Sequence, residues 1–374
     1  MEMIYLDNAA TSFPKADGVS DAMKRFLDKE CTNVGRGSYV RAQEAGIAVI
    51  ETRERIRDLF DCPDEKHVIF TGGMTASLNT VIKGYVRPGD RVLVSSFEHN
   101  SVIRPLVQMG ADIVRIPASE DGVSDLTKLP RDLSSFRLCV HTFASNVSGM
   151  LQPVTELSVI LKDAGVPFCI DAAQAAGHFP FSMRQIGADA ICMPAHKGLR
   201  AAQGLGILCL SPAFADKLDP LISGGTGSVS DSELIPPFYP DRLEAGTLNL
   251  PGIVGLHAAL NHADFQAAHV HETVLTERFL HAIRDIPHIR LLGSSISADR
   301  VSVISLDFLR IDNGEISYRL ENEFGILTRC GLHCAPDAHR AFGTFPHGAV
   351  RFSFSVATTE EEIDRCVSAI ALLA

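Results

Sequence analysis

Short, nearly continuous apolar runs are the feature of this 374-residue chain that most limits its fold. They recur through the first two-thirds of the sequence and are rich in Val, Ile, Leu and Phe, with helical patterns such as residues 75–84 and 154–164 between them. Apolar runs without polar alternation suit strands that are buried on both faces of a largely parallel sheet. The strand–helix rhythm therefore predicts an α/β fold. Strands are expected at residues 67–71, 91–95, 112–116, 137–142, 168–171, 189–193 and 206–210.

The composition changes after this region. Residues 223–249 are rich in Gly, Ser and Pro and predict a long irregular connection, which in a folded protein is usually functional or disordered. The remaining segments alternate helix and strand in an α+β pattern. We expect a large α/β domain with a mostly parallel sheet over residues 15–249, and a smaller α+β domain formed by residues 1–14 and 250–374. Its helices are expected at about 251–265, 270–286, 314–324 and 359–372, and its strands at 301–306 and 350–354.

Charge and cysteine content exclude several classes of protein. The formal net charge is -11 and no basic run is present, so neither nucleic acid nor a membrane surface is expected as a partner. No apolar run reaches membrane-spanning length, and the first residues lack the pattern of a signal peptide. The nine cysteines are scattered through strand-like segments without zinc spacing. They indicate reduced thiols in the cytoplasm and no metal site.

Two strand ends carry the residue types of a cofactor site. Asp171 ends one apolar run, and His196 and Lys197 follow another. Ligands bind outside the carboxyl ends of strands in open α/β sheets. A carboxylate there can keep a pyridine nitrogen protonated, and a partly desolvated lysine is a good amine for a Schiff base. The alternatives without a cofactor are that Asp171 caps a helix and that Lys197 is an ordinary loop lysine.

Two further strand ends complete the set. Gly72 and Gly73 turn the chain between a strand and a helix, whose first N–H groups favour a phosphate. His99 follows the strand at 91–95 and offers a flat ring for stacking. Any strand-to-helix turn can use two glycines, and a lone histidine is more often structural. Together, however, the four strand ends supply what pyridoxal 5'-phosphate (PLP) requires.

Seven motifs resemble a known family in their order and spacing. The chain resembles the class V aminotransferase group of fold-type I PLP-dependent transferases, and within it the cysteine desulfurases and selenocysteine lyases. The resemblance spans almost the whole chain. The motifs are YLDNAAT at 5–11, NVGRG at 33–37, EHNS at 98–101, DAAQ at 171–174, HK at 196–197, EAGT at 244–247 and RCGLHCA at 329–335.

The resemblance implies a PLP-binding role for each matched residue. Lys197 is expected to hold the cofactor as a Schiff base and then to move the substrate's Cα proton. Thr247 is expected to reach the phosphate of a neighbouring subunit, which implies a homodimer. The other implied contacts are Asp171 with the pyridine nitrogen, Gln174 and Asn146 with the ring hydroxyl, His99 against the ring, and Gly73, Met74, Thr75 and His196 with the phosphate.

The resemblance also implies how substrate is bound. Arg351 is expected to clamp the substrate carboxylate, because a guanidinium binds a carboxylate through two parallel hydrogen bonds. Asn8 and Asn146 are the other expected substrate contacts. His99 is expected to take part in catalysis by exchanging protons with the substrate.

Cys334 determines which reaction is expected. It follows His333 in a segment that reads as a loop, where a partly exposed thiol with a lowered pKa would be a nucleophile. The alternative is an inert loop cysteine. Resemblance to the cysteine desulfurases implies that L-cysteine is converted to L-alanine while its sulfur passes to Cys334 as a persulfide, which is ordinary thiol exchange chemistry.

The sequence departs from the family pattern at several positions. Leu332 and Ala195 replace a histidine and a serine, residues 200–202 (Arg-Ala-Ala) replace a Gly-Pro turn, and Gly35 replaces a histidine. The lysine and the acid are intact, so the departures bear on substrate choice and on the fate of the sulfur. The cysteine loop resembles the short-loop group, which implies a sulfur-acceptor protein as a partner.

Three other functions remain open at this point. A selenocysteine lyase acting on L-selenocysteine would share the fold and cofactor without needing Cys334. Another PLP reaction, such as transamination, β-elimination or epimerisation, would leave Cys334 a bystander. A non-catalytic scaffold would have no reason to keep Lys197, Asp171, His99 and Arg351 together.

Overall fold

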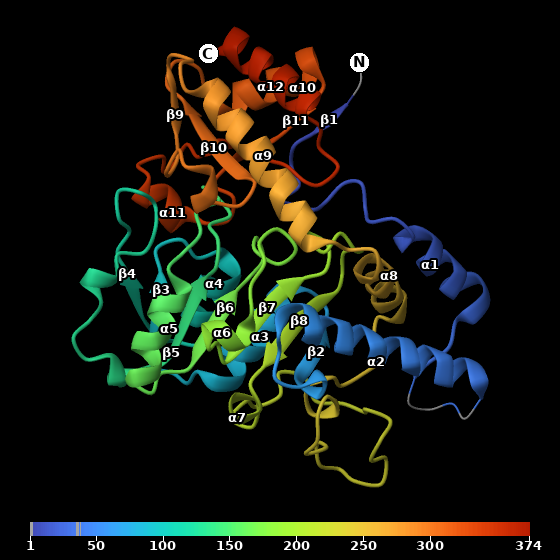
Figure 1. Ribbon diagram of the computed structural model, residues 1–374. Coiled ribbons are helices and arrows are strands. Elements are labelled where there is room, and N and C mark those ends of the chain that lie inside the picture. The colour runs from blue at the N-terminus through green and yellow to red at the C-terminus, as the bar shows by residue number, and fades with distance from the viewer. Residues whose placement is uncertain (1–2, 35–36, 38) are drawn as a thin grey trace.

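A seven-stranded sheet forms the centre of the larger part of the molecule (Figure 1). The computed structural model describes residues 3–34, 37 and 39–374, so Gly35 and Arg36 of the motif at 33–37 lie outside the described residues. The strands follow the order β2-β8-β7-β6-β5-β3-β4. Their bounds are β2 Val68–Thr71, β3 Arg91–Ser95, β4 Asp112–Ile116, β5 Phe136–Thr142, β6 Phe168–Asp171, β7 Ala190–Pro194 and β8 Gly206–Leu210.

The sheet is mostly parallel, as the apolar runs predict. Strands β7, β6, β5, β3 and β4 pair in parallel, whereas β8 is antiparallel to both of its neighbours, β2 and β7. The α/β fold class expected from the sequence is therefore confirmed. Because only β8 is reversed, β2, β3, β5, β6 and β7 end at the same edge of the sheet.

Both faces of this sheet are buried. Alternate strand residues such as Ile69 and Phe70 belong to two different core clusters, one on each face. This double burial explains why the strands read as continuous apolar runs. The helices around the sheet are α1 Val19–Arg25, α2 Val40–Phe60, α3 Met74–Tyr85, α4 Asn100–Gln108, α5 Val154–Asp163, α6 Met183–Ile186, α7 Pro212–Ala215 and α8 Leu250–Asn261.

A second, four-stranded sheet lies above the first in Figure 1, and both chain ends lie on its side. Its order is β12-β13-β10-β9, and all neighbouring strands are antiparallel. A separate short pair joins β1 to β11 in parallel. The elements are β1 Ile4–Tyr5, α9 Phe265–Ile283, β9 Ile289–Leu291, β10 Val303–Phe308, α10 Asn313–Phe324, β11 Ile326–Leu327, β12 Arg329–Gly331, α11 Pro336–Ala341, β13 Ala349–Ser353 and α12 Glu360–Leu373.

Local signals fix several helix ends. Helix α12 begins with a capping box, in which the Thr359 side chain accepts from the Glu362 N–H and the Glu362 side chain accepts from the Thr359 N–H. Helix α10 begins at an Asp312 cap and ends at Gly325, which adopts the left-handed conformation that favours glycine. These caps set where the helices lie over the four-stranded sheet.

The connection predicted at residues 223–249 is irregular, apart from a 3-10 turn at Asp241–Leu243. Helix α8 follows it and contributes Leu250, Ile253 and Leu256 to the core cluster of the larger sheet. A different cluster contains Ile4, Leu6 and residues from α9 onward. The domain limits at 14–15 and 249–250 stay a prediction.

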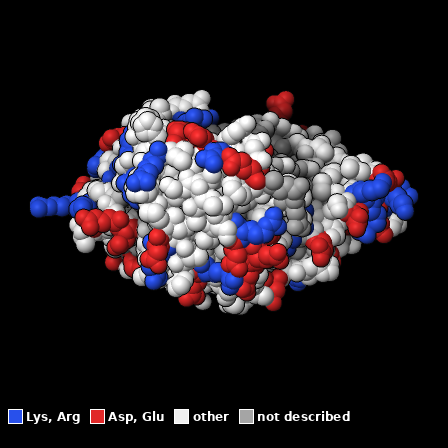
Figure 2. Space-filling view, turned by 90° about the horizontal axis from the view of Figure 1, so that it is seen from above, with Lys and Arg blue, Asp and Glu red and all other residues white. Residues whose placement is uncertain are grey.

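Across residues 3–34, 37 and 39–374, none of the helices combines the length and the apolarity that a membrane crossing requires. On the face seen from above in Figure 2, Lys and Arg lie near Asp and Glu, so this face carries charges of both signs.

Candidate active site

The carboxyl ends of the parallel strands surround a cavity of about 180 Å³. Because β2, β3, β5, β6 and β7 end at one edge, polar residues that are far apart in sequence meet there. The lining includes eight residues predicted for the site: Met74, Thr75, His99, Asn146, Asp171, Gln174, His196 and Lys197.

Lys197 lies in the turn that follows β7. Burial lowers the pKa of its amine from 10.5 to about 8, and the positive charge of Arg351 adds to this effect. Its ammonium forms no hydrogen bond or ion pair within the described part of the chain. A lysine of this kind is a nucleophilic amine near neutral pH, which fits the predicted attachment of a carbonyl cofactor.

Asp171 is the last residue of β6. Burial raises its pKa, while a hydrogen bond from the Ala173 N–H (2.9 Å) and the charge of Lys197 lower it. A cationic ring nitrogen beside this carboxylate would supply the opposite charge that a buried carboxylate needs. The Gln174 amide donates to the Ala9 carbonyl at 3.1 Å, and its Oε1 is buried without a partner. Both residues therefore fit a bound polar ring.

A phosphate cradle lies at the start of α3. Gly73 stands at the cap position without a side chain to cap the helix, and by position the N–H groups of Met74 and Thr75 have no intrahelical acceptor. Gly73 has φ 133°, and a Cβ on Gly206 would come within 2.4 Å of the Gly73 carbonyl carbon. Two glycines are thus required for this turn, which leaves N–H groups open to an anion.

Two neutral imidazoles flank the lysine. Burial first, and then the charge of Lys197, lower the pKa of both His99 and His196 to about 4. His99 caps α4, with its Nδ1 accepting from the Ser101 N–H at 3.0 Å. The Nδ1 of His196 lies 3.0 Å from the Thr11 hydroxyl. In neither ring does Nε2 have a hydrogen-bond partner among the described residues, which leaves it for a ligand.

Arg351 reaches the site through Asn146. Its guanidinium donates to the Asn146 carbonyl (3.1 Å) and pairs with the Asp7 carboxylate (2.8 Å). Only 3% of the side chain is exposed, and its Nε is buried without a partner. A cation so deeply buried, with a free donor beside the cavity lining, suits a carboxylate ligand.

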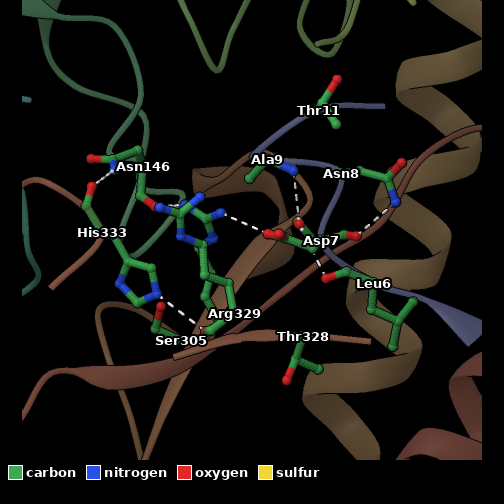
Figure 3. A network of polar contacts seen from close by, with 12 residues as sticks. Leu6, Asp7, Asn8, Ala9, Thr11, Asn146, Ser305, Thr328, Arg329 and His333 are labelled. Carbon is green, nitrogen blue, oxygen red and sulfur yellow. Dashed lines mark hydrogen bonds and ion pairs between the residues drawn. The ribbon is translucent and has the colours of Figure 1, made fainter. Parts of the chain in front are cut away.

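The Cys334 loop is tied to the same edge of the sheet. The Asn146 amide donates to the His333 carbonyl at 2.7 Å (Figure 3), and the Asn100 N–H donates to the Cys334 carbonyl at 2.7 Å. Cys334 itself is exposed. The loop therefore presents a thiol next to elements that line the cavity.

His333 does not face the thiol in the way the sequence suggested. Its Nε2 donates to the Arg329 carbonyl at 3.2 Å, and its Nδ1 lies 3.2 Å from the His339 ring. Burial lowers its pKa well below the ordinary value, so it carries no positive charge at neutral pH. Both ring nitrogens of His333 thus lie against other groups, so its position next to Cys334 in the sequence gives no side-chain contact with the thiol.

Two predicted site residues lie away from the cavity. The Asn8 amide donates to the Ser353 carbonyl at 3.0 Å and accepts from the Phe13 N–H at 3.1 Å, so it ties backbone segments together. Thr247 is exposed and borders a different hollow, with Gly72 and Thr80. The predicted roles of Asn8 and Thr247 stay predictions.

The sequence reasoning missed four residues that shape the site. Thr142 and Ser101 line the cavity. Each of them has a signal in the sequence, because Thr142 ends the strand expected at 137–142 and Ser101 belongs to the EHNS motif. The charge of Arg329, in the RCGLHCA motif, lowers the pKa of Lys197 and His99. Glu98, also in EHNS, is fully buried, and burial raises its pKa to about 8.

Comparison with known proteins places the chain in a family. It belongs to the aminotransferase class-V family, whose profile matches residues 4–366. The family expected from the motifs is therefore confirmed, and this family implies PLP as the cofactor.

Within this family, the chain is similar to proteins named as cysteine desulfurases. A probable cysteine desulfurase from Methanothermobacter thermautotrophicus is 31% identical, with 96% of this chain and 92% of the relative covered. The cysteine desulfurase CsdA from Escherichia coli is 30% identical, with 98% and 93% covered. Among solved structures, an apo cysteine desulfurase from Thermococcus onnurineus NA1 superposes with a TM-score of 0.92 at 27% identity, covering 99% of this chain and 94% of that one.

Proposed function

We propose that this protein is a PLP-dependent cysteine desulfurase, which converts L-cysteine to L-alanine and leaves a persulfide on Cys334. One observation carries the proposal: the cavity that contains Lys197 and Asp171 is joined by hydrogen bonds to the loop that exposes Cys334. Several relatives of about 30% identity carry the name cysteine desulfurase, which supports the same reading.

The residues around the cavity fit PLP. Gly73, Met74, Thr75 and His196 would hold its phosphate, Asp171 its pyridine nitrogen, Gln174 and Asn146 its ring hydroxyl, and His99 one face of the ring. When bound, PLP supplies a carbonyl for amines and an electron sink for charge that develops at a substrate carbon. Thr247 would contribute to the phosphate site of a second subunit.

Lys197 acts as the amine and then as the base. With a pKa of about 8, part of its population is neutral near pH 7, so it can attack a carbonyl. With substrate in the cavity, the same amine would take the proton from the substrate's Cα. Burial keeps water from competing for that position.

Arg351 and Asn146 orient the substrate. The guanidinium exchanges part of its contact with Asp7 for the carboxylate of the amino acid. Because Asn146 donates to the His333 carbonyl, the substrate and the cysteine loop share one anchor.

Cys334 then takes the sulfur. Its thiolate attacks the sulfur of the substrate, and an S–S bond forms as the substrate's Cβ–S bond breaks. The electron pair of the broken bond stays with the amino-acid fragment, which takes up a proton and leaves as L-alanine. The sulfur remains on Cys334 for a sulfur-acceptor protein or a small thiol.

Products from L-cysteine test this proposal. We expect wild type to form alanine and, with a reductant, sulfide, whereas Cys334→Ala retains PLP and forms neither. Cys31→Ala is the matched control, because Cys31 is the other exposed thiol. Full desulfuration by Cys334→Ala would refute the nucleophile. Inertness of wild type toward cysteine, together with turnover of L-selenocysteine or another amino acid, would refute the desulfurase assignment and leave the cofactor assignment standing.

The same proposal includes a cytoplasmic homodimer with the domain limits given above. Exposed apolar residues on α2 and in the long connection support self-association, among them Ile47, Ile50, Leu234 and Phe238. All nine cysteines are free, which is compatible with a reducing compartment. Sedimentation at several concentrations tests the dimer, and a monomer with full activity would refute it.

A further inference from the structure

A second cavity, of about 310 Å³, lies outside the candidate active site. Its lining includes the turn Gly198–Leu199–Arg200, directly after Lys197, and the junction between α8 and α9. No role proposed above uses this cavity. Arg200 belongs to the segment that departs from the family's Gly-Pro turn.

Arg200 is poorly satisfied by the protein alone. Its Nε is buried without a partner, and one Nη donates to the Lys15 carbonyl at 3.3 Å. The guanidinium forms no ion pair within the described part of the chain, and the carboxylates of Asp17 and Glu272 act on it only through longer-range attraction. Arg200 also has φ 56°, in the left-handed region that favours glycine. A half-buried guanidinium that lines a cavity without an ion pair is a site for an oxyanion or a carboxylate.

The remaining lining limits what the ligand is. Asp17 and Asp264 contribute carboxylates, and Asp17 forms no hydrogen bond or ion pair among the described residues. A plain anion would be repelled by these two groups, and a plain cation by Arg200. A ligand that carries one positive and one negative charge can pair with a carboxylate and with the Arg200 guanidinium at the same time. Apolar lining residues, such as Leu199 and Phe265, leave room for a short apolar side chain.

We propose that this cavity binds a small α-amino acid as a zwitterion, with its carboxylate on Arg200 and its ammonium group toward Asp17. The volume lies at the lower end of the range for small-molecule pockets, which suits an amino acid of three or four carbons. The inference does not depend on the proposed function, because it uses neither Cys334 nor PLP.

The site is connected to the turn that holds Lys197. The Arg200 N–H donates to the Lys197 carbonyl at 2.8 Å, and the Ala16 N–H donates to the Arg200 carbonyl at 3.0 Å. Lys15 then donates to the His196 carbonyl at 3.1 Å. An occupant of the cavity therefore restrains the backbone on both sides of the active-site lysine.

Equilibrium dialysis of the holoenzyme with labelled L-alanine tests the site. We expect Arg200→Gln to weaken one class of binding site by at least about tenfold, because it removes a charge-assisted contact. Arg131→Gln, at an exposed arginine, is the matched control and should bind as wild type does. Arg351→Gln separates the active site: it should remove alanine bound there and leave the Arg200-dependent class unchanged, whatever the reaction proves to be.

Two probes test the chemical class of the ligand. Propionate carries the carboxylate alone and inorganic phosphate a larger negative charge, and we expect both to bind at least about tenfold more weakly than alanine. Asp17→Asn should weaken alanine and not propionate. Equal binding of propionate or phosphate would refute the amino-acid assignment. Identical alanine binding by wild type, Arg200→Gln and Arg200→Gly would refute the site itself, and retention of the PLP absorbance shows that these variants are folded.

Discussion

Glu98 should make the protein less stable as the pH rises through neutrality. Its Oε1 accepts from the Ser95 hydroxyl at 2.5 Å and from the Thr142 N–H at 2.8 Å, while its Oε2 is buried without a partner. Burial is the largest cause that raises its pKa from 4.5 to about 8, and the charge of Asp171 adds to it. The folded protein therefore holds a proton that the unfolded chain releases above about pH 4.5.

The sign and size of the effect follow from that difference. Below pH 4.5 the carboxyl is protonated in both the folded and the unfolded state, so it does not make the free energy of unfolding depend on pH. Between pH 4.5 and 8 the unfolded chain gains stability by ionising, so the free energy of unfolding falls. From pH 5 to pH 8 the two pKa values give a loss of about 3.5 kcal/mol. In a chain of this length that corresponds to a fall of about 4 °C in melting temperature.

Glu98→Gln should abolish this pH dependence. Glutamine keeps an oxygen for Ser95 and Thr142 and cannot ionise, so any packing cost that it adds is the same at every pH. We expect the melting temperature of the variant, relative to wild type, to rise by about 4 °C from pH 5 to pH 8. Glu277→Gln, at an exposed position on α9, should track wild type. Parallel curves for wild type and Glu98→Gln, measured by scanning calorimetry from pH 5 to pH 8, would refute the reasoning.

Three further predictions rest on other contacts. Glu244→Ala should lower the free energy of unfolding by about 3–5 kcal/mol, because it leaves the buried guanidinium of Arg53 without the carboxylate that lies 2.6 Å away. Denaturant titration measures this loss, and a loss below about 1 kcal/mol would contradict the prediction. The rate of PLP uptake by the apo chain, followed by visible absorbance, should rise with pH with a midpoint near pH 8, where the Lys197 amine loses its proton. Arg351→Gln removes a positive charge that lowers the pKa of Lys197, so it should move that midpoint upward. A midpoint near pH 10.5 in wild type would contradict the lowered pKa of Lys197. Arg200→Gly should leave the melting temperature unchanged or raise it. Relief of the left-handed strain at Arg200 gains about 1–2 kcal/mol, whereas the greater freedom of glycine in the unfolded chain costs about 0.5–1 kcal/mol. A clear fall in the melting temperature would contradict this prediction.

The strands could be predicted because their burial leaves a strong mark on the sequence. The ranges expected for β3, β4, β6 and β8 coincide with the observed ones. The reversed direction of β8 could not be predicted, because a strand that is buried on both faces is apolar whichever way it runs.

Other elements left too weak a pattern. Helix α2 was not predicted, because its buried face uses small residues such as Ala42 and Ala45 while Ile47 and Ile50 are exposed. Strands β9, β11 and β12 have only two or three residues each, too few for a periodic signal. Their positions come from tertiary pairing with longer neighbours.

The site was predictable to the extent that it depends on strand ends. Asp171, Lys197 and His99 meet because parallel strands end at one edge. The contacts that join the four-stranded sheet to this edge link residues far apart in sequence, as in the hydrogen bond from the Arg351 guanidinium to the Asn146 carbonyl, 205 positions away. No local pattern encodes such a pair, and for the same reason adjacency in sequence was a poor guide to what the His333 ring contacts.

The geometry of the cysteine loop gives a physical reason for these long-range contacts. His333 and Cys334 have φ of 50° and 57°, two consecutive non-glycine residues in the left-handed region, each of which costs about 1–3 kcal/mol. Such a backbone persists only where its surroundings hold it, and here the holders are the Asn146 amide and the Asn100 N–H, one lining the cavity and the other following His99. Because one of these two contacts comes from Asn146, a residue of the cavity lining, a substrate that binds Asn146 also acts on a residue that holds the Cys334 backbone. We therefore expect the position of the exposed thiol to respond to the occupancy of the cavity, which a reaction between a loop cysteine and a buried substrate requires.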